Sequence, residues 1–166
     1  MLPSWAVVTP ARLAHIERVA ALVDAWATAL DVSPAEHARW VRAAWLHDAL
    51  RDAPEGGGGE LEHGPRCAER LAREGERDQG VLDAVRFHSL GYAGWDDVGR
   101  MLYLADHLEP GRSHDRAARA RLRDRMPVER AAVLREVARR RIVRNLQSGW
   151  PLAAETVAFW NALASG

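Results

Sequence analysis

The sequence contains little sulfur, no lysine and no long apolar run. Its single cysteine, Cys67, excludes an internal disulfide. No apolar stretch is long enough to span a bilayer, or uncharged enough to form the hydrophobic region of a signal peptide. These absences predict a cytoplasmic protein that is not held at a membrane.

Because lysine is missing, arginine supplies all 23 of the cationic side chains, against 23 acidic residues. No net charge therefore draws the whole chain to nucleic acid or to a membrane. The charge is unevenly spread, since residues 112–144 hold 12 arginines and only four acids. This segment is either a solvated helical face whose arginine stems cover apolar neighbours, or a surface for the phosphates of a nucleotide or an RNA partner.

With 166 residues, 48% of them hydrophobic, the chain suits one compact domain with a full core. Apolar residues recur at helical spacing and no strand pattern appears, so the expected class is all-α. Thr9-Pro10 starts a helix over about 10–30, and Ser33-Pro34 starts a second that runs toward residue 47. Gly56–Gly59 predict a flexible loop. Further helices are expected at 65–74, 78–89, 96–108, 127–147 and 152–163, with a short one after a loop at 110–116.

The doublet His47-Asp48 ends the apolar run of the second predicted helix. Imidazole nitrogen and carboxylate oxygen are ligands that Zn, Fe, Mn and similar divalent ions accept. A core-forming helix does not usually finish on two such groups unless something holds them. The doublet therefore indicates a metal site.

Other histidines and one further aspartate extend this site. Taken alone, a histidine at a helix end is more often a capping or surface residue. A closed structural site would be four-coordinate and rich in cysteine, whereas six nitrogen and oxygen ligands with one carboxylate able to bridge favour two catalytic ions. The predicted ligands are His15, His47, Asp48, His63, His88 and Asp106.

Several residues near these ligands have simpler interpretations. Cys67 lies four residues after His63, but a small buried packing residue is expected there. His107 should be turned away from the metal-facing side of its helix and His37 should face solvent, whereas the loop residue His114 stays open as a substrate contact. Trp26, Trp40, Trp45 and Trp160 are expected in the core, while Tyr92 and Trp95 are candidates for stacking on a base.

Five segments together resemble a known family. They are Arg12–His15, Trp45–Arg51, His63–Pro65, Val81–Gly91 and Met101–Arg112, and the last two are the most specific. The sequence resembles the HD-domain metal-dependent phosphohydrolases, in particular the bacterial YqeK type, which hydrolyses diadenosine tetraphosphate symmetrically. The resemblance implies a single-domain HD-domain helical bundle over residues 1–166, with a metal-binding core at about 10–112 and C-terminal helices at 113–166.

The resemblance also implies roles for the candidate ligands. His15, His47, Asp48 and Asp106 would hold one ion, with Asp48 bridging to a second ion held by His63 and His88. Two divalent ions are expected, iron first, with Mn, Zn, Co or Ni as alternatives. A hydroxide that bridges the ions would attack phosphorus and release two ADP molecules, which makes His47 and Asp48 the expected catalytic pair.

Arg51, Ser89 and Arg112 are the expected substrate contacts, although either arginine could equally be a surface salt-bridge partner. The segment between Asp48 and His63 departs from the family, since it is short and glycine-rich. Residues 113–116 also differ from the family's sequence pattern, at the position where the nucleotide end would be recognised.

Two other functions stay open. Another HD phosphohydrolase could use this constellation on nucleoside monophosphates or guanosine alarmones. Alternatively, the chain could be a regulatory protein that binds metal and nucleotide and docks RNA or a ribosome-associated partner. A monomer or a homodimer is expected in either case.

Overall fold

The computed structural model describes residues 1–54 and 61–165, so the predicted loop at Gly56–Gly59 lies outside the described residues. Within these ranges all regular structure is helical, as predicted, and no strand is present. None of the described helices is long and apolar enough to cross a membrane. The helices are α1 (Pro10–Ala29), α2 (Pro34–Leu46), α3 (His63–Arg73), α4 (Gln79–Phe87), α5 (Asp97–Leu108), α6 (Arg116–Arg125), α7 (Arg130–Gln147) and α8 (Ala154–Ser165).

Local capping explains why the first two helices begin where the sequence predicts. The hydroxyl of Thr9 accepts a hydrogen bond from the Arg12 amide at 3.2 Å, and Pro10 follows as the first helical residue. Ser33 caps α2 in the same way, with 3.2 Å to the Glu36 amide. By contrast, α7 starts at residue 130 rather than 127, because residues 126–129 form the turn that closes α6.

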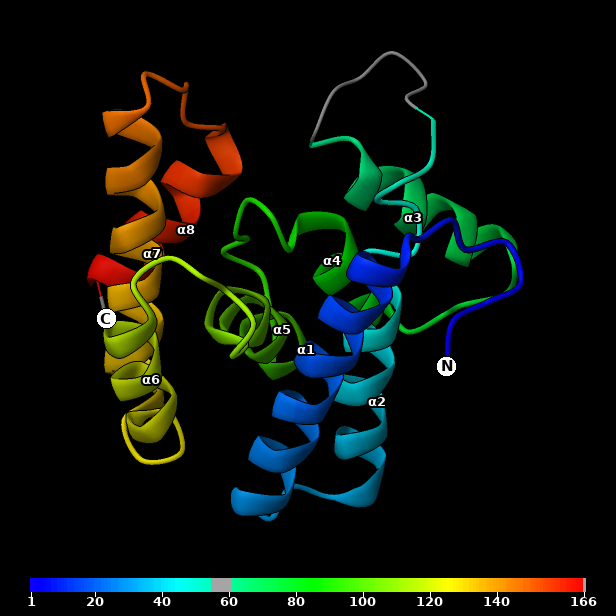
Figure 1. The fold of residues 1–166 in the computed structure, drawn as a ribbon, viewed down its shortest axis with the longest axis horizontal. Coiled ribbons are helices and arrows are strands. Elements are labelled where there is room, and N and C mark those ends of the chain that lie inside the picture. The colour runs from blue at the N-terminus through cyan, green and yellow to red at the C-terminus, as the bar shows by residue number, and fades with distance from the viewer. Residues whose placement is uncertain (55–60, 166) are drawn as a thin grey trace.

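Helix α5 lies in the middle of the molecule (Figure 1). It contacts α1, α2 and α4, and also α6 and α7 of the C-terminal part. Figure 1 shows α6, α7 and α8 as a group beside α5, on the side away from α1 and α2. Helix α5 is therefore buried along most of its length, and it carries one of the predicted metal ligands.

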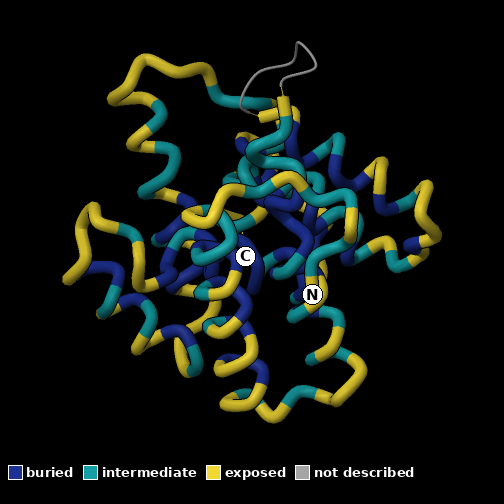
Figure 2. The backbone as a smooth tube through the Cα atoms, turned by 45° about the vertical axis from the view of Figure 1, so that its right-hand side comes forward, coloured by how far each residue is buried: buried dark blue, intermediate teal, exposed yellow. Residues whose placement is uncertain are grey.

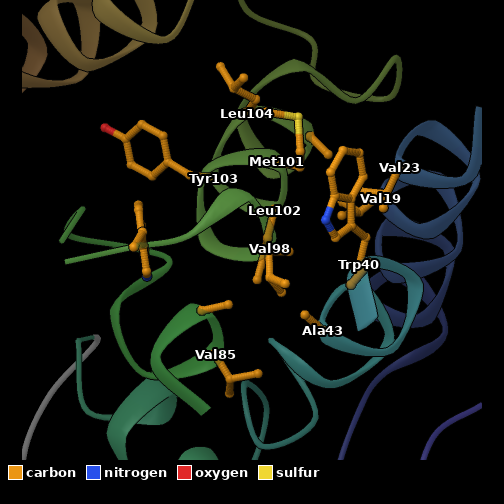
Figure 3. Close-up of a cluster of buried hydrophobic side chains, with 14 of the residues drawn as sticks. Val19, Val23, Trp40, Ala43, Val85, Val98, Met101, Leu102, Tyr103 and Leu104 are labelled. Carbon is orange, nitrogen blue, oxygen red and sulfur yellow. The ribbon is translucent and has the colours of Figure 1, made fainter. Parts of the chain in front are cut away.

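The core gathers where the helices converge on α5. Buried stretches of the chain cluster in the interior, and most exposed stretches lie on the outer turns (Figure 2). Figure 3 shows Trp40 of α2 beside Val19 and Val23 of α1, with Val98 and Leu102 of α5 next to them. Of the four tryptophans predicted in the core, Trp26 and Trp40 are buried, whereas Trp45 and Trp160 are partly buried and pack against it.

The expectation that Trp95 stacks on a base is wrong. Its ring is only 3% exposed and packs 5.5 Å from Tyr103 and 5.3 Å from Phe159, between ring centroids. The indole Nε1 donates to the carbonyl oxygen of Asp83 at 3.0 Å. Tyr92 stacks on Phe87 at 4.5 Å, so both aromatic residues have partners within the protein.

Candidate metal centre

Five segments of the fold bring the six predicted ligands together. Helix α1 carries His15, the His47-Asp48 doublet directly follows α2, His63 opens α3, His88 directly follows α4, and α5 carries Asp106. All six side chains are buried, and His47 is fully inaccessible. Ionisable groups at this depth are costly without compensating partners, so their convergence indicates a shared function.

Asp48 lies at the centre of the cluster, and its two oxygens face different histidine pairs. Oδ1 lies 3.2 Å from Nε2 of His63 and 3.4 Å from Nε2 of His88. Oδ2 lies 3.5 Å from Nε2 of His47 and 3.8 Å from Nε2 of His15. Two groups of side chains could each hold an ion, and Asp48 belongs to both. This is the placement that a carboxylate needs to bridge two ions.

Asp106 lies on the side of the cluster that His15 occupies. Its Oδ1 is 3.1 Å from Nε2 of His15 and 2.5 Å from Nη2 of Arg112. Burial raises the pKa of Asp106, but the neighbouring His15 imidazole and the charge of Arg112 outweigh it and hold the pKa well below its ordinary value. Asp106 is therefore an anion that could complete the coordination of the ion beside His15 and His47.

Three of the four histidines in the cluster are oriented by acceptors behind their rings. Nδ1 of His47 donates to the Ala44 carbonyl, and Nδ1 of His88 donates to the Val85 carbonyl, each at 2.8 Å. In His15, Nδ1 lies 3.1 Å from Oε1 of Glu109. With Nδ1 protonated in this way, each Nε2 presents a lone pair to the cluster, as metal-ligating histidines do.

Two of these nitrogens, Nε2 of His15 and Nε2 of His47, are buried without a hydrogen-bond partner in the described part of the chain. Burial lowers the pKa of His47 to about 4, which keeps its imidazole neutral and able to coordinate. Orphaned buried lone pairs beside two carboxylates fit a divalent cation. The residues present therefore suit the metal ions that the sequence predicts.

A close approach of α3 to α4 places His63 beside His88. A Cβ atom at Gly64 would lie only 2.7 Å from the carbonyl oxygen of Arg86, so only glycine lets the two backbones come this near. The Nε2 atoms of His63 and His88 are then 3.0 Å apart. Cys67 of α3 is a packing residue, as expected, because its thiol donates to the Leu46 carbonyl and burial raises its pKa to about 12.

A cavity of about 650 Å³ opens over the cluster. All three predicted substrate contacts, Arg51, Ser89 and Arg112, line it. His107 and His114 line it as well, whereas His37 is paired with Asp24 at 2.7 Å. The cavity also has arginines to which the sequence assigned no individual role: Arg12, Arg119, Arg141 and Arg144.

Arg12 and Glu109 contact predicted ligands but were not among the predicted site residues. Nη1 of Arg12 lies 2.7 Å from Oδ2 of Asp48. Glu109 is 2% exposed and contacts His15, and Arg18 donates to its other oxygen at 2.6 Å. Burial raises the pKa of Glu109, but hydrogen bonds from His15 and Arg18 lower it to about 2. Helical spacing could have predicted that Arg12 lies at the site, because it precedes His15 by three residues on the same face of α1.

Comparison with known proteins places these residues in a family. The model of the HD domain matches residues 12–111. Symmetrical bis(5'-nucleosyl)-tetraphosphatase of Bacillus subtilis (strain 168) is 29% identical over 108 residues, which cover 64% of this chain and 57% of that protein. The protein of the same name from Halalkalibacterium halodurans is 31% identical over 108 residues, covering 64% and 56%. The chain thus spans little more than half the length of these curated relatives.

A solved structure shares the fold. It is described as a predicted HD superfamily hydrolase involved in NAD metabolism from Clostridium acetobutylicum, and it superposes with a TM-score of 0.78 at 22% identity. The superposition covers 95% of this chain and 91% of that one. Since the HD-domain match spans more than half of the sequence and includes all six clustered histidines and aspartates, the chain belongs to the HD-domain family.

Proposed function

We propose that this protein is a metal-dependent phosphohydrolase that cleaves dinucleoside polyphosphates, with diadenosine tetraphosphate giving two ADP. The observation that carries the proposal is the position of Asp48, whose two oxygens face separate histidine pairs at the bottom of an arginine-lined cavity. The names of the curated relatives support the choice of substrate. Iron is the proposed metal, because the resemblance to the family implies it.

When bound, two divalent ions would lower the pKa of a water molecule and offset negative charge on the phosphoryl oxygens. The chain supplies the scaffold for this chemistry. His47 and His88 hold their Nε2 atoms toward Asp48 because carbonyl groups fix the opposite ring nitrogens. Glu109 fixes His15 in the same way.

The arginines around the cavity suit a substrate with several phosphates. Arg112 is held beside the cluster by its contact with Asp106, and Arg51 and Ser89 line the same space. The leaving nucleoside diphosphate is a stabilised anion, so positioning and charge stabilisation would supply most of the rate. Guanidinium groups provide both, since one group can bond two phosphate oxygens.

Product identity tests this proposal. Wild type and Asp48→Ala are incubated with diadenosine tetraphosphate, a nucleoside monophosphate and a guanosine alarmone, and the products are separated by chromatography. Two ADP from wild type and none from Asp48→Ala are expected. Phosphate or pyrophosphate from the other two substrates, with diadenosine tetraphosphate untouched, would assign the site to a different HD reaction. Nucleotide binding without turnover of any substrate would indicate a regulatory protein instead.

A further inference from the structure

Part of the cavity wall comes from helices outside the family match. Arg141, Arg144 and Asn145 of α7 line the cavity, together with Trp150 from the connection between α7 and α8. These residues follow residue 111, at which the HD-domain match ends. The segment joining α7 to α8 is the loop at the upper end of both helices in Figure 1. A second part of the fold therefore shares the cavity with the candidate metal ligands.

Of the α7 residues that line the cavity, Arg141 contacts Ser89 and the candidate ligand Asp106. Its Nη2 donates to the Ser89 carbonyl at 2.7 Å, and its Nη1 lies 3.6 Å from Oδ2 of Asp106. The guanidinium carbon also lies 4.5 Å from the centroid of the Tyr103 ring. These contacts fix Arg141 next to the candidate metal centre.

Arg144 lies one helical turn further along the same face of α7. Its side chain is exposed, and it forms no ion pair with any residue of the ranges 1–54 and 61–165. Other arginines of α7 differ from it, because Arg139 and Arg140 both bond to Glu136. Arg144 thus keeps its donors available to an anion in the cavity.

Trp150 is 53% exposed, although it lines the cavity. Its position follows from the way α7 ends. Gly149 takes a left-handed conformation with φ +69°, and its amide bonds to the Leu146 carbonyl at 3.1 Å. The Trp150 amide then bonds back to the Asn145 carbonyl at 2.9 Å, which completes a Schellman motif. The turn holds the exposed indole beside an arginine-lined cavity, a combination suited to stacking on a base.

We propose that Arg144 and Trp150 form the subsite for the distal part of a dinucleoside polyphosphate. Arg144 contacts a phosphate remote from the metal centre, and Trp150 stacks on the nucleobase attached to that end. This inference rests on the proposed function and deepens it, because it assigns nucleotide recognition to the C-terminal helices. The metal ligands alone could not distinguish a nucleotide from a simple polyphosphate.

Equilibrium binding to the metal-loaded protein tests the subsite. The probes are a methylene-bridged, non-hydrolysable diadenosine tetraphosphate and inorganic tripolyphosphate, which has no base. Trp150→Ala should weaken binding of the first probe about 5- to 100-fold and leave the second unchanged, whereas Trp150→Phe should retain most of the affinity. Arg144→Gln should weaken binding of both probes about 10-fold. Arg121→Gln removes another exposed arginine, from α6 and outside the cavity, and should change neither affinity.

Unchanged dinucleotide affinity in Trp150→Ala would overturn the subsite. So would an equal loss for both probes in that variant, or no binding of the dinucleotide analogue by wild type. A change of oligomeric state in Trp150→Ala, measured by light scattering, would also overturn it and would make the exposed indole a contact between chains. A different result would rule out the proposed reaction without ruling out the subsite. If diadenosine tetraphosphate is not hydrolysed but the analogue shows the expected variant pattern, the subsite stands and the reaction does not.

Discussion

Glu109 lies behind His15, with its Oε1 3.1 Å from the Nδ1 atom of the imidazole. Arg18 and the amide of Gly111 both donate to Oε2 of this buried carboxylate. The contact fixes which nitrogen of His15 carries the proton and leaves Nε2 directed at the other candidate metal ligands. A residue that is not itself a candidate ligand thus prepares one for coordination.

Glu109→Gln should lower the affinity for the ion beside His15 by about 10- to 100-fold, because the amide keeps the shape but loses the charge that makes His15 a stronger ligand. Metal titration followed by competition with a chelator measures this. The control is Glu76→Gln, which changes another buried glutamate that pairs with Arg42 at 2.7 Å. Glu76→Gln should reduce stability without changing metal affinity, and equal affinities in both variants would refute the role of Glu109.

Gly64→Ala should disturb the pair His63 and His88. The added Cβ would meet the Arg86 carbonyl oxygen at 2.7 Å, so α3 must move away from α4, at a cost of about 1–3 kcal/mol in the free energy of unfolding. We expect weaker binding of the ion between these two histidines.

Gly75→Ala provides the control for that prediction. Gly75 has φ +102°, and a Cβ there would meet no atom within 4 Å. Its alanine variant should therefore lose stability through backbone strain while its metal content stays normal. Normal metal content in Gly64→Ala as well would show that the close approach of α3 and α4 does not matter for the site.

Arg12→Gln should separate metal binding from turnover. Arg12 is not a ligand, but its Nη1 lies 2.7 Å from Asp48 and the residue lines the cavity. Both ions should stay bound, while hydrolysis of diadenosine tetraphosphate falls by roughly 100-fold, as for the loss of one positioned charged donor. Metal analysis and steady-state kinetics give the two readouts, with Arg100→Gln on the surface of α5 as the control. Loss of metal together with activity would make Arg12 a structural residue only.

The starts of α1 and α2 and the all-helical class could be predicted because their signals are local. The six histidines and aspartates that converge were proposed from their positions taken together and from the resemblance to the HD domain. Thr9-Pro10 and Ser33-Pro34 cap their helices within a few residues. The contacts between Glu109 and His15 could not be predicted in this way, because these residues are 94 positions apart and meet only when α5 packs on α1.

The arginine-rich segment at residues 112–144 also has features that depend on long-range packing and could not be predicted from sequence. Arg139 and Arg140 pair with Glu136 at helical spacing, which agrees with a solvated face. Arg141 and Arg144 line the cavity instead, which agrees with a surface for phosphates. The sequence alone could not show which of these arginines face solvent and which line the cavity, because this depends on which side of α7 packs against α5. Trp95 was misjudged for a similar reason, since Phe159 comes from α8 at the far end of the chain.

The ion pair of Arg39 with Asp78 should make stability depend on pH. Arg39 donates to both oxygens of Asp78, at 2.6 and 3.0 Å, and holds the pKa of this carboxyl below its ordinary value. A carboxyl with a lowered folded-state pKa stabilises the protein above its unfolded pKa, and this contribution is lost as the pH falls through the folded-state pKa.

Asp78→Asn keeps the cap of α4, because asparagine is also a good N-cap, and removes only the charge. We expect a loss of about 1 kcal/mol in the free energy of unfolding at pH 7, shrinking toward zero as the pH falls through the lowered folded-state pKa of Asp78. Urea denaturation at several pH values measures it. Asp124→Asn, at an exposed position of α6, should show neither effect, and a difference between Asp78→Asn and wild type that grew with acidity would contradict the ion-pair explanation.

The most direct measurement is the metal content per chain of purified wild type, His63→Ala and His37→Ala, determined by elemental analysis after loading with one divalent metal. His63 lies 3.2 Å from Oδ1 of Asp48 and belongs to one of the two candidate metal groups. His37 pairs with Asp24 and belongs to neither group. If Asp48 bridges two ions, wild type and His37→Ala should hold two ions per chain and His63→Ala should hold one. Equal metal content in His63→Ala and wild type would contradict a two-ion centre built around Asp48.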